Sequence, residues 1–315
     1  MDIKFSILIP AYKKLFLKEA ISSILEQSYS NIEIVIVDDC SPEDLKSVVD
    51  CFSDIRVKYY RNEKNYGAEH VVGNWNKCLS YATGNYVLCM GDDDKLTPDC
   101  LQNCTKYIDE NRDVSVFHLQ TLLIDENSEV IDIQEGRPAW ESVYSATFNK
   151  LKGRLQYIGD WLFKTESLRN CGGFFDLPFA WYSDDITPLI VGKEYGIINI
   201  PEFGFQYRVS SQTISSDDKN IEGKIDACRK AYLWYKNFIS GTVCNASDKV
   251  YQQCILRQLP EMGRKAIIKT LSSGMANGRL RAVFRLFRDR KKLNITIATI
   301  MTSLIYSMKS LSIVR

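Results

Sequence analysis

Apolar residues in the first hundred positions alternate between nearly continuous runs and runs with helical spacing. The nearly continuous runs at 5–9, 32–37 and 86–90 predict buried strands, and a shorter strand is expected at 57–60. Between them, apolar residues recur every three or four positions and predict amphipathic helices over Leu17–Leu25, Leu45–Phe52 and Val71–Leu79. Strands that alternate with helices predict an α/β fold, a Rossmann-like and mainly parallel sheet flanked by helices.

The pattern is less regular in the middle of the chain and helical at its end. A helix is expected to begin at Thr97-Pro98-Asp99, with Thr97 as its N-cap, and strands are expected at 114–119 and within 157–164. Residues 210–218 have the composition of a polar linker. We therefore expect two halves of one domain, at residues 1–100 and 101–215, and a helical region at 216–315.

The composition narrows the kind of protein and the kind of chemistry. With 45% hydrophobic and 25% charged residues, the 315-residue chain is globular rather than disordered or fibrous. Its ten cysteines form no CxxC pair, which favours reduced thiols in the cytoplasm, and its first residues resemble a strand rather than a signal peptide. Since His70 and His118 are the only histidines, carboxylates must carry most of any catalysis.

The net charge of +1 hides a strongly basic end. Residues 256–315 hold thirteen Lys and Arg against two acids, a net charge of +11. An apolar helical stripe at 280–287 is flanked by arginines, and the uncharged stretch 293–308 is too short to span a bilayer. This pattern favours an interfacial helix on an anionic membrane, while packing on the rest of the protein stays open. Nothing else in the chain resembles a nucleic-acid recognition module, so no nucleic-acid partner is expected.

The candidate chemistry lies where the predicted strands end. The sequence has no GxGxxG after the first strand, no GxxxxGK[ST] and no GxSxG. Instead, strand ends carry Pro10-Ala11-Tyr12, Asp38-Asp39 and Gly91-Asp92-Asp93-Asp94, and the carboxyl ends of parallel strands meet at one edge. Clustered carboxylates repel one another unless a cation such as Mg²⁺ or Mn²⁺ is present, which would complete its shell with the phosphates of a nucleotide. A solvated acidic turn is the alternative.

These segments resemble a known family. FSILIPAY, IEIVIVDDCS, RNEKNYG and YATGNYVLCMGDDDKLTPDCL are similar, in order and spacing, to the nucleotide-binding segments of family 2 glycosyltransferases with the GT-A fold. The resemblance covers residues 3–215. It implies that Pro10, Ala11 and Tyr12 line the base and ribose and that Asp39 recognises uracil. Asn65, Gly67 and Lys77 match the segment before the fourth strand, where Lys77 or His70 would reach a phosphate.

The resemblance also assigns the metal motif. Asp92 and Asp93 match the family's acidic element, which most often reads Asp-x-Asp-Asp, and Gly91 replaces its first Asp. We place the metal, Mn²⁺ or Mg²⁺, on Asp93 and expect Asp92 nearer the ribose or donor sugar. Arg208 would stabilise the leaving diphosphate, although a plain surface arginine fits the sequence equally well.

The second half is expected to bind the acceptor. Inverting transfer needs a carboxylate that takes the proton of the attacking hydroxyl, and Asp185 is the candidate base. Asp184, expected to bind the acceptor, stands where the family usually has Glu; both acids would also complement the helix dipole. Gly173 and Phe174 resemble the family's acceptor loop, and Trp181 would stack on an acceptor sugar or pack in a core.

The sequence thus predicts a metal-dependent inverting transferase. It would move a hexose or N-acetylhexosamine from a UDP-sugar to a saccharide acceptor linked to polyprenyl diphosphate, in O-antigen or capsule synthesis. The protein would be cytoplasmic and peripheral on the inner face of the cell membrane. The alternatives are a nucleotidylyltransferase, for which Lys13-Lys14 without glycines is a poor triphosphate loop, and a non-catalytic carbohydrate- or membrane-binding scaffold.

Overall fold

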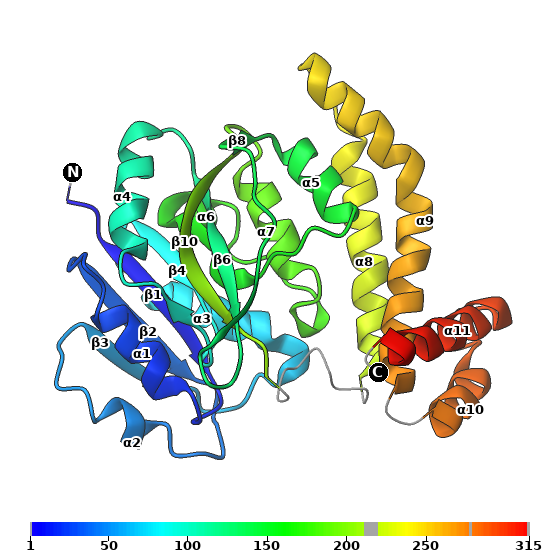
Figure 1. The fold of residues 1–315 in the computed structure, drawn as a ribbon, viewed down its shortest axis with the longest axis horizontal. Coiled ribbons are helices and arrows are strands. Elements are labelled where there is room, and N and C mark those ends of the chain that lie inside the picture. The colour runs from blue at the N-terminus through cyan, green and yellow to red at the C-terminus, as the bar shows by residue number, and fades with distance from the viewer. Residues whose placement is uncertain (1, 211–219, 277–278, 314–315) are drawn as a thin grey trace. The chain divides into compact units, whose positions relative to one another are not determined.

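A computed structural model describes residues 2–210, 220–276 and 279–313, which divide into two compact units (Figure 1). Unit 1 holds residues 2–176 and 183–210. Unit 2 holds residues 177–182, 220–276 and 279–313. From residue 211 onward, the polar linker expected at 210–218 lies outside the described residues.

Unit 1 is built on a ten-stranded sheet. Eight of its strands follow the order β3-β2-β1-β4-β9-β6-β10-β5, and the other two are β7, which pairs with β6, and β8, which pairs with β10. The strands are β1 (Phe5–Ala11), β2 (Ile32–Asp38), β3 (Val57–Arg61), β4 (Tyr86–Cys89), β5 (Lys95–Leu96), β6 (Val116–Ile124), β7 (Val130–Ile133), β8 (Trp140–Glu141), β9 (Trp161–Lys164) and β10 (Ile197–Arg208). The expected α/β architecture is confirmed.

The register of the sheet brings three strand ends to one edge. β1 pairs in parallel with β2, from Phe5 opposite Ile32 to Ala11 opposite Asp38, and also with β4. β3 extends this parallel half, while β9 joins β4 in the antiparallel sense and β10 runs parallel to β6. The carboxyl ends of β1, β2 and β4 therefore share an edge, as the sequence predicts.

Helices cover both faces of the sheet. They are α1 (Leu17–Leu25), α2 (Lys46–Val49), α3 (Val71–Tyr81), α4 (Cys100–Glu110), α5 (Val143–Leu151), α6 (Thr165–Asn170) and α7 (Ser183–Val191), with short 3₁₀ turns η1 (Ala68–His70) and η2 (Ile158–Asp160). Buried residues of α1, α2 and α4 join the alternate residues Phe5, Ile7 and Ile9 of β1 in one core. On the other face Trp75 of α3 lies edge-on to Phe174. Burial on both faces explains the nearly continuous apolar runs.

The start of α4 differs from the prediction. The helix begins at Cys100, and the Thr97 hydroxyl donates to Phe203 O (2.6 Å) instead of capping it. The prediction that Thr97 is the N-cap is therefore wrong, because a strand partner takes its hydroxyl. The predicted buried face of α4 is confirmed at Leu101, Cys104 and Ile108.

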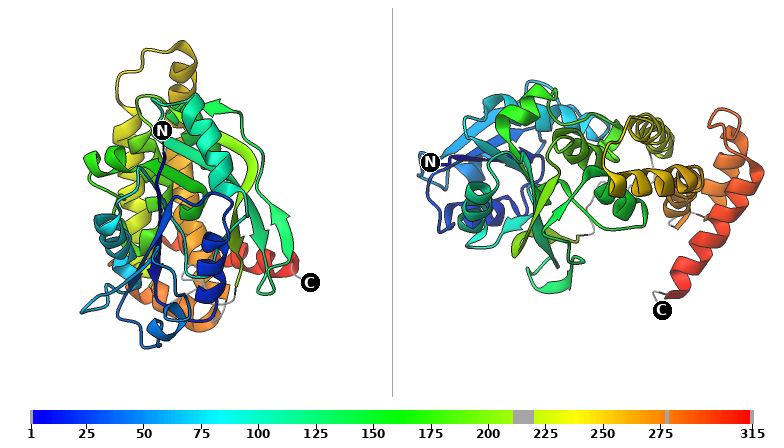
Figure 2. Two further views of the ribbon diagram at one scale, coloured as in Figure 1. Left: turned by 90° about the vertical axis from the view of Figure 1, so that its left-hand side faces the viewer. Right: turned by 90° about the horizontal axis from the view of Figure 1, so that it is seen from above.

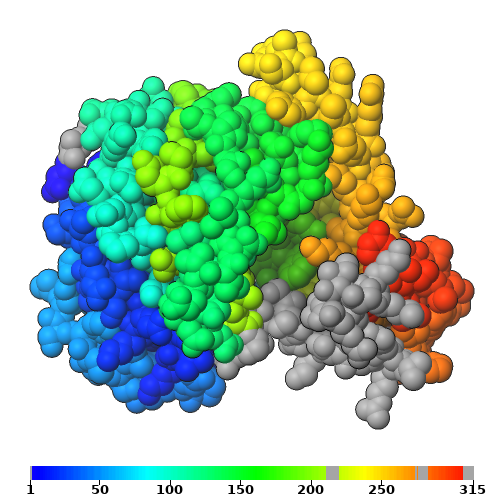
Figure 3. Space-filling model, viewed as in Figure 1, coloured from blue at the N-terminus to red at the C-terminus, as the bar shows by residue number. Residues whose placement is uncertain are grey.

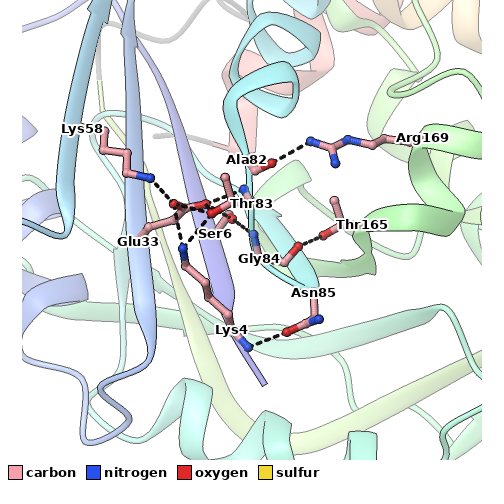
Figure 4. Close-up of polar contacts among 10 residues, drawn as sticks. All are labelled: Lys4, Ser6, Glu33, Lys58, Ala82, Thr83, Gly84, Asn85, Thr165 and Arg169. Carbon is pink, nitrogen blue, oxygen red and sulfur yellow. Dashed lines mark hydrogen bonds and ion pairs between the residues drawn. The ribbon is translucent and has the colours of Figure 1, made fainter. Parts of the chain in front are cut away.

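A buried carboxylate ties the sheet to the loop before β4 (Figure 4). Glu33 of β2 accepts hydrogen bonds from Ser6 Oγ (2.6 Å) and Thr83 N (2.6 Å), and it forms ion pairs with Lys58 (2.6 Å) and Lys4 (3.2 Å). Burial raises the pKa of Glu33, but these hydrogen bonds outweigh it and lower the pKa to about 2. The cluster thus joins β1, β2, β3 and the α3–β4 loop.

Unit 2 is helical. Its elements are η3 (Pro178–Ala180), α8 (Ile221–Ile239), α9 (Ala246–Ala276), α10 (Arg279–Asp289) and α11 (Ile297–Ile313). The long helices α8 and α9 lie side by side, and α10 and α11 pack on α9 and on each other (Figure 2). A small core of Ile225, Leu271, Met275, Leu286 and Ile300, among others, joins the four helices. None of the helices in the described ranges is long and apolar enough to cross a membrane.

Candidate functional site

The turn after β4 contacts the turn after β1 directly. The buried Asp92 carboxylate accepts two hydrogen bonds through Oδ2, from Tyr12 N and Lys13 N, each at 2.6 Å. The turn after β2 joins them, because Asp39 N donates to Ala11 O (2.9 Å). The expected convergence of the three strand ends is therefore confirmed, and it holds Ala11, Tyr12, Asp39 and Asp92 together.

The two acids after β2 have different environments. Asp38 is fully buried and pairs with Arg61, and it also accepts from the Tyr59 hydroxyl (2.6 Å). Asp39 accepts from the Asn62 side chain (3.0 Å) and from Tyr66 N (2.9 Å), both through Oδ1. Asp39 Oδ2 takes no hydrogen bond from the described residues. The Asp38 carboxylate therefore stabilises the fold, whereas Oδ2 of Asp39 could accept a hydrogen bond from a ligand.

The loop around Asp39 contains two further predicted site residues. Asn65 accepts from Gly67 N in a tight turn in which Gly67 has φ of 75°. Lys77 lies on α3, and its ammonium sits 5.1 Å from the centre of the Tyr81 ring, one turn further along the helix. The Lys77 ammonium thus contacts an aromatic face, and its role at a phosphate stays a prediction.

The acidic turn after β4 explains why residue 91 is a glycine. A Cβ at Gly91 would lie 2.7 Å from Asp93 Oδ1 and 2.8 Å from Asp94 Oδ2. These two carboxylates therefore occupy the space that an Asp at position 91 would need. Burial and the charge of Asp93 raise the pKa of Asp92 to about 6, and the same causes raise the pKa of Asp94 well above its usual range. The repulsion expected from the sequence is present.

Arg208, the last residue of β10, is buried with this turn. Its backbone N donates to Asp94 Oδ1 (2.9 Å) and its Nε to Asp93 O (2.7 Å). The other guanidinium nitrogens donate to Asp125 O (2.9 Å), Glu126 O (3.3 Å), Glu19 Oε2 (3.0 Å) and Ser128 Oγ (3.1 Å). Arg208 is therefore not a surface arginine. Its donors are used within the protein, which also corrects the idea that it binds a leaving diphosphate.

The donor atoms of the acidic turn fit a hard divalent cation. In the described part of the chain no group of three or more His, Cys, Asp or Glu side chains could enclose a metal. Mg²⁺ and Mn²⁺ sites commonly use one or two carboxylates and complete the shell with waters and substrate phosphates. Asp93 is the half-exposed acid of the turn, so its oxygens are the ones open to such a cation.

The candidate base in the second half is held by two side chains that the sequence does not reveal. Asp185 of α7 is buried, and its Oδ1 pairs with Lys150 Nζ (2.7 Å) and accepts from Gln156 Nε2 (2.9 Å). Asp184 beside it is half-buried, and burial and the Asp185 charge raise its pKa, while Lys150 acts in the opposite direction. Since Lys150 and Gln156 lie in an irregular region of the sequence, only spatial contact identifies them.

The glycine turn before α7 packs into the core. Gly173 has φ of 89°, and a Cβ there would lie 2.3 Å from Asn76 Oδ1. Phe174 N donates to that oxygen (2.8 Å), and the Phe174 ring is 2% exposed. Phe174 is an expected acceptor-binding residue, but its ring lies in the core. Only the backbone of this turn is open to that role.

Trp181 belongs to the short segment of unit 2 that precedes α7. Its ring lies 5.0 Å from Lys224 Nζ of α8. Around it Phe179, Ala180 and Tyr182 have φ of 61°, 54° and 73°, which is unusual for residues with a side chain. Such strain costs about 1–3 kcal/mol per residue and concentrates at functional segments. Because of this strain, Trp181 stays a candidate for stacking on an acceptor sugar.

Comparison with known proteins decides the family. Residues 6–160 match the family model described as Glycosyl transferase family 2. The chain contains a family 2 glycosyltransferase domain. This family 2 domain spans β1 to η2, and it therefore includes both acidic turns.

Two relatives of this glycosyltransferase have named activities. One is the UDP-Glc:alpha-D-GlcNAc-diphosphoundecaprenol beta-1,3-glucosyltransferase WfgD of Escherichia coli, 29% identical over 219 residues, which are 69% of this chain and 81% of WfgD. Another is the GalNAc(5)-diNAcBac-PP-undecaprenol beta-1,3-glucosyltransferase of Campylobacter jejuni subsp. jejuni serotype O:2, 36% identical over 110 residues. That match covers 34% of this chain and only 35% of the relative.

The fold has solved counterparts. The structure of S. aureus TarS 1–349 in complex with UDP-GlcNAc superposes with a TM-score of 0.68 at 15% identity, over 98% of this chain and 92% of TarS 1–349. At this identity the likeness concerns the fold alone. The glycosyltransferase therefore has the expected GT-A fold with a helical C-terminal region.

Proposed function

We propose that this family 2 glycosyltransferase transfers a hexose or an N-acetylhexosamine from a UDP-sugar to a saccharide acceptor, with inversion at the anomeric carbon. The observation that carries the proposal is the contact of the acidic turn with the β1 turn, through the two hydrogen bonds to Asp92. It puts acids that suit a metal and diphosphate on the same sheet edge as Asp39.

The donor nucleotide would bind along this edge. The base and ribose would lie against Pro10, Ala11 and Tyr12, at the end of β1. Asp39 Oδ2 would accept the uracil N–H, while Asn62 and the main chain of Tyr66 fix the other oxygen. The remaining nucleotide-binding candidates are Asn65, Gly67, Lys77 and Asp92.

A divalent cation, Mn²⁺ or Mg²⁺, would bind at Asp93. When bound, such a cation neutralises charge on the diphosphate leaving group. The chain's own contribution is to hold the acidic turn, which Arg208 does through the Asp93 carbonyl and the Asp94 carboxylate. Asp94, the third acid of this cluster, is buried and would support the turn.

Asp185 would act as the base. In an inverting transfer, the acceptor hydroxyl forms the new bond to the anomeric carbon as the bond to UDP breaks, and a carboxylate takes the hydroxyl proton. Lys150 and Gln156 both bind Asp185 Oδ1, so Oδ2 takes no hydrogen bond from the described residues and would receive that proton. Asp184 is the second candidate, because burial and the charge of Asp185 raise its pKa and so make its carboxylate a stronger base. Trp181 and the backbone of Gly173 would contribute to acceptor binding.

The acceptor would be a saccharide on polyprenyl diphosphate. Support comes from the names of the two relatives, which are both glucosyltransferases acting on undecaprenol-linked diphosphates. Such an acceptor would place the protein in the cytoplasm, on the inner face of the cell membrane, in the synthesis of O-antigen or capsule. The basic C-terminal helices would provide the peripheral attachment.

Thermal melting with UDP, GDP and dTDP, each with Mn²⁺ or with a chelator, tests the donor site. We expect only UDP with Mn²⁺ to raise the melting temperature, and we expect Asp93→Ala to lose this shift. Asp99→Ala is the matched control, because Asp99 is an exposed acid six residues further along and caps no helix with its side chain. Equal shifts for UDP with and without metal would contradict the assigned metal site.

Transfer itself is measured as UDP release with candidate UDP-sugars and undecaprenyl-diphosphate saccharides. We expect Asp185→Asn to lose at least about 100-fold in kcat while keeping the UDP shift. A protein that binds nucleotide but turns over no donor with any acceptor would favour the scaffold. Formation of a sugar nucleotide from UTP and a sugar phosphate would favour the nucleotidylyltransferase.

A further inference from the structure

Helix α11 exposes apolar residues and buries small polar ones. Among the side chains of α11 that the structure describes, residues 297–307, the fully buried ones are Ile300, Ser303 and Ser307. The Ser272 hydroxyl of α9 donates to Ser303 O (2.9 Å). Ile297, Met301 and Ile305, spaced four apart, are 52%, 46% and 52% exposed. At 3.6 residues per turn, Met301 lies about 100° around the helix from Ile300. An ordinary surface helix has the opposite distribution.

Helix α10 also exposes an apolar side chain, and this side chain lies next to a cluster of Lys and Arg residues. Leu286 of α10 is buried in the core of unit 2, whereas Phe284 is 75% exposed. The side chains of Arg285 and Arg288 are 63% and 75% exposed, and both share the single acid Asp289. Residues 279–292 hold seven Lys and Arg against that one acid. Parts of α10 and α11 are visible in orange and red in Figure 3.

We infer that Ile297, Met301 and Ile305 of α11, with Phe284 of α10, form a face that inserts into the headgroup region of an anionic lipid bilayer. These four residues are called the apolar face. The inference rests on the proposed function for its choice of a membrane as partner, and it deepens that proposal by naming the inserting residues. The cations at 285–292 would lie over lipid phosphates.

Charge complementarity selects this partner. A second copy of the chain would bring the same seven cations against their counterparts, which like-charge repulsion disfavours. Insertion across the bilayer is disfavoured, because no described helix could span it. An anionic surface satisfies the arginines and the apolar face together, since each Lys or Arg near such a surface adds to binding.

The face is tested with vesicles and full-length protein. Vesicles of phosphatidylcholine with 30% phosphatidylglycerol are sedimented with wild type and with Ile297→Ser/Met301→Ser/Ile305→Ser. The matched control is Val130→Ser/Ile131→Ser/Ile133→Ser on β7, three aliphatic residues that are 55%, 54% and 56% exposed. All proteins are first checked for unchanged thermal melting.

We expect the α11 triple variant to bind these vesicles about 100-fold more weakly than wild type, and the β7 triple variant to bind as wild type does. Phe284→Ser is expected to lose about tenfold. Wild-type binding is expected to fall to the level of the α11 variant on vesicles of pure phosphatidylcholine, which offer no anionic lipid to the cations. The same fall is expected in 1 M NaCl, which screens the cations.

Three results would overturn the inference. Wild type that does not sediment with anionic vesicles has no such surface. If the α11 variant binds vesicles as tightly as wild type, the protein attaches by charge alone. A wild-type dimer that becomes monomeric in the α11 variant shows that the apolar face is a contact between copies. Asp93→Ala is expected to bind vesicles normally, so a failed nucleotide shift and a failed membrane contact are distinguishable.

Discussion

The Glu33 cluster makes acid stability a test of the fold. Glu33 is 1% exposed, and its pKa is lowered from 4.5 to about 2 by hydrogen bonds from Lys58, Ser6 and Thr83, against the opposing effect of burial. One pKa unit corresponds to about 1.4 kcal/mol, so the full shift corresponds to about 3 kcal/mol. Lys4 and Lys58 are about one-third exposed, and solvent screening reduces this to about 2 kcal/mol.

Glu33→Gln removes the charge but keeps the shape. A carboxylate whose pKa is lower in the folded state stabilises the protein above its unfolded pKa and loses that effect as the pH falls towards the folded pKa. At pH 7 we therefore expect Glu33→Gln to unfold about 2 kcal/mol more easily, which is about 4–8 °C in melting temperature. The difference from wild type should shrink between pH 4.5 and pH 2, the interval between the two pKa values.

Urea unfolding followed by far-UV circular dichroism, at several pH values from 7 to 3, measures this difference. Glu110→Gln is the control, since Glu110 is exposed at the end of α4. A difference between wild type and Glu33→Gln that is the same at pH 7 and pH 3 would refute the electrostatic reasoning. A Glu33→Gln variant as stable as wild type at pH 7 would refute the role of the cluster.

Three further predictions concern the site. Arg208→Gln should raise the Mn²⁺ concentration for half-maximal activity about tenfold with little change in UDP-sugar KM at saturating metal, because the charge-assisted hydrogen bond from Arg208 Nε to the Asp93 carbonyl is lost; unchanged metal titration would contradict this. Lys150→Met should lower kcat most at the acidic end of the pH profile, since Lys150 opposes the raised pKa of Asp184, and a uniform loss across pH would argue for a packing role. Asp38→Asn should lower the free energy of unfolding in urea by about 2 kcal/mol and keep the rise in melting temperature with UDP. Asp39→Asn should keep the free energy of unfolding and lose the rise in melting temperature with UDP.

The parallel half of the sheet could be predicted from sequence for a physical reason. Strands buried on both faces are mostly apolar, so 5–9 and 32–37, in which only Ser6 and Glu33 are polar, differ sharply from the helical periodicity between them. The edge where the strands end then follows from topology, and with it the meeting of Tyr12, Asp39 and Asp92. These inferences need only the local pattern and one rule of chain direction.

The rest depends on contacts between distant residues, which no local pattern encodes. Thr97 has the composition of an N-cap but bonds a strand 106 residues away. Phe174 matches an acceptor loop in sequence, yet its ring is buried against Trp75. Lys150 holds Asp185 from a helix that gives no sign of this function in its sequence. A charged or aromatic residue in a motif therefore shows its role only when its partner is known.

The place of Arg208 has a consequence for how the protein matures during synthesis. Its partners Glu19 and Asp93 are 189 and 115 residues earlier in the chain, and β10 lies inside the sheet between β6 and β5. A nascent chain that has emerged only to residue 160, the end of the family 2 match, lacks the strand that completes the sheet and the side chain that fixes the acidic turn. Contacts of such long sequence separation form late. The nucleotide site of a growing polypeptide would thus become competent only after residue 208 has left the ribosome.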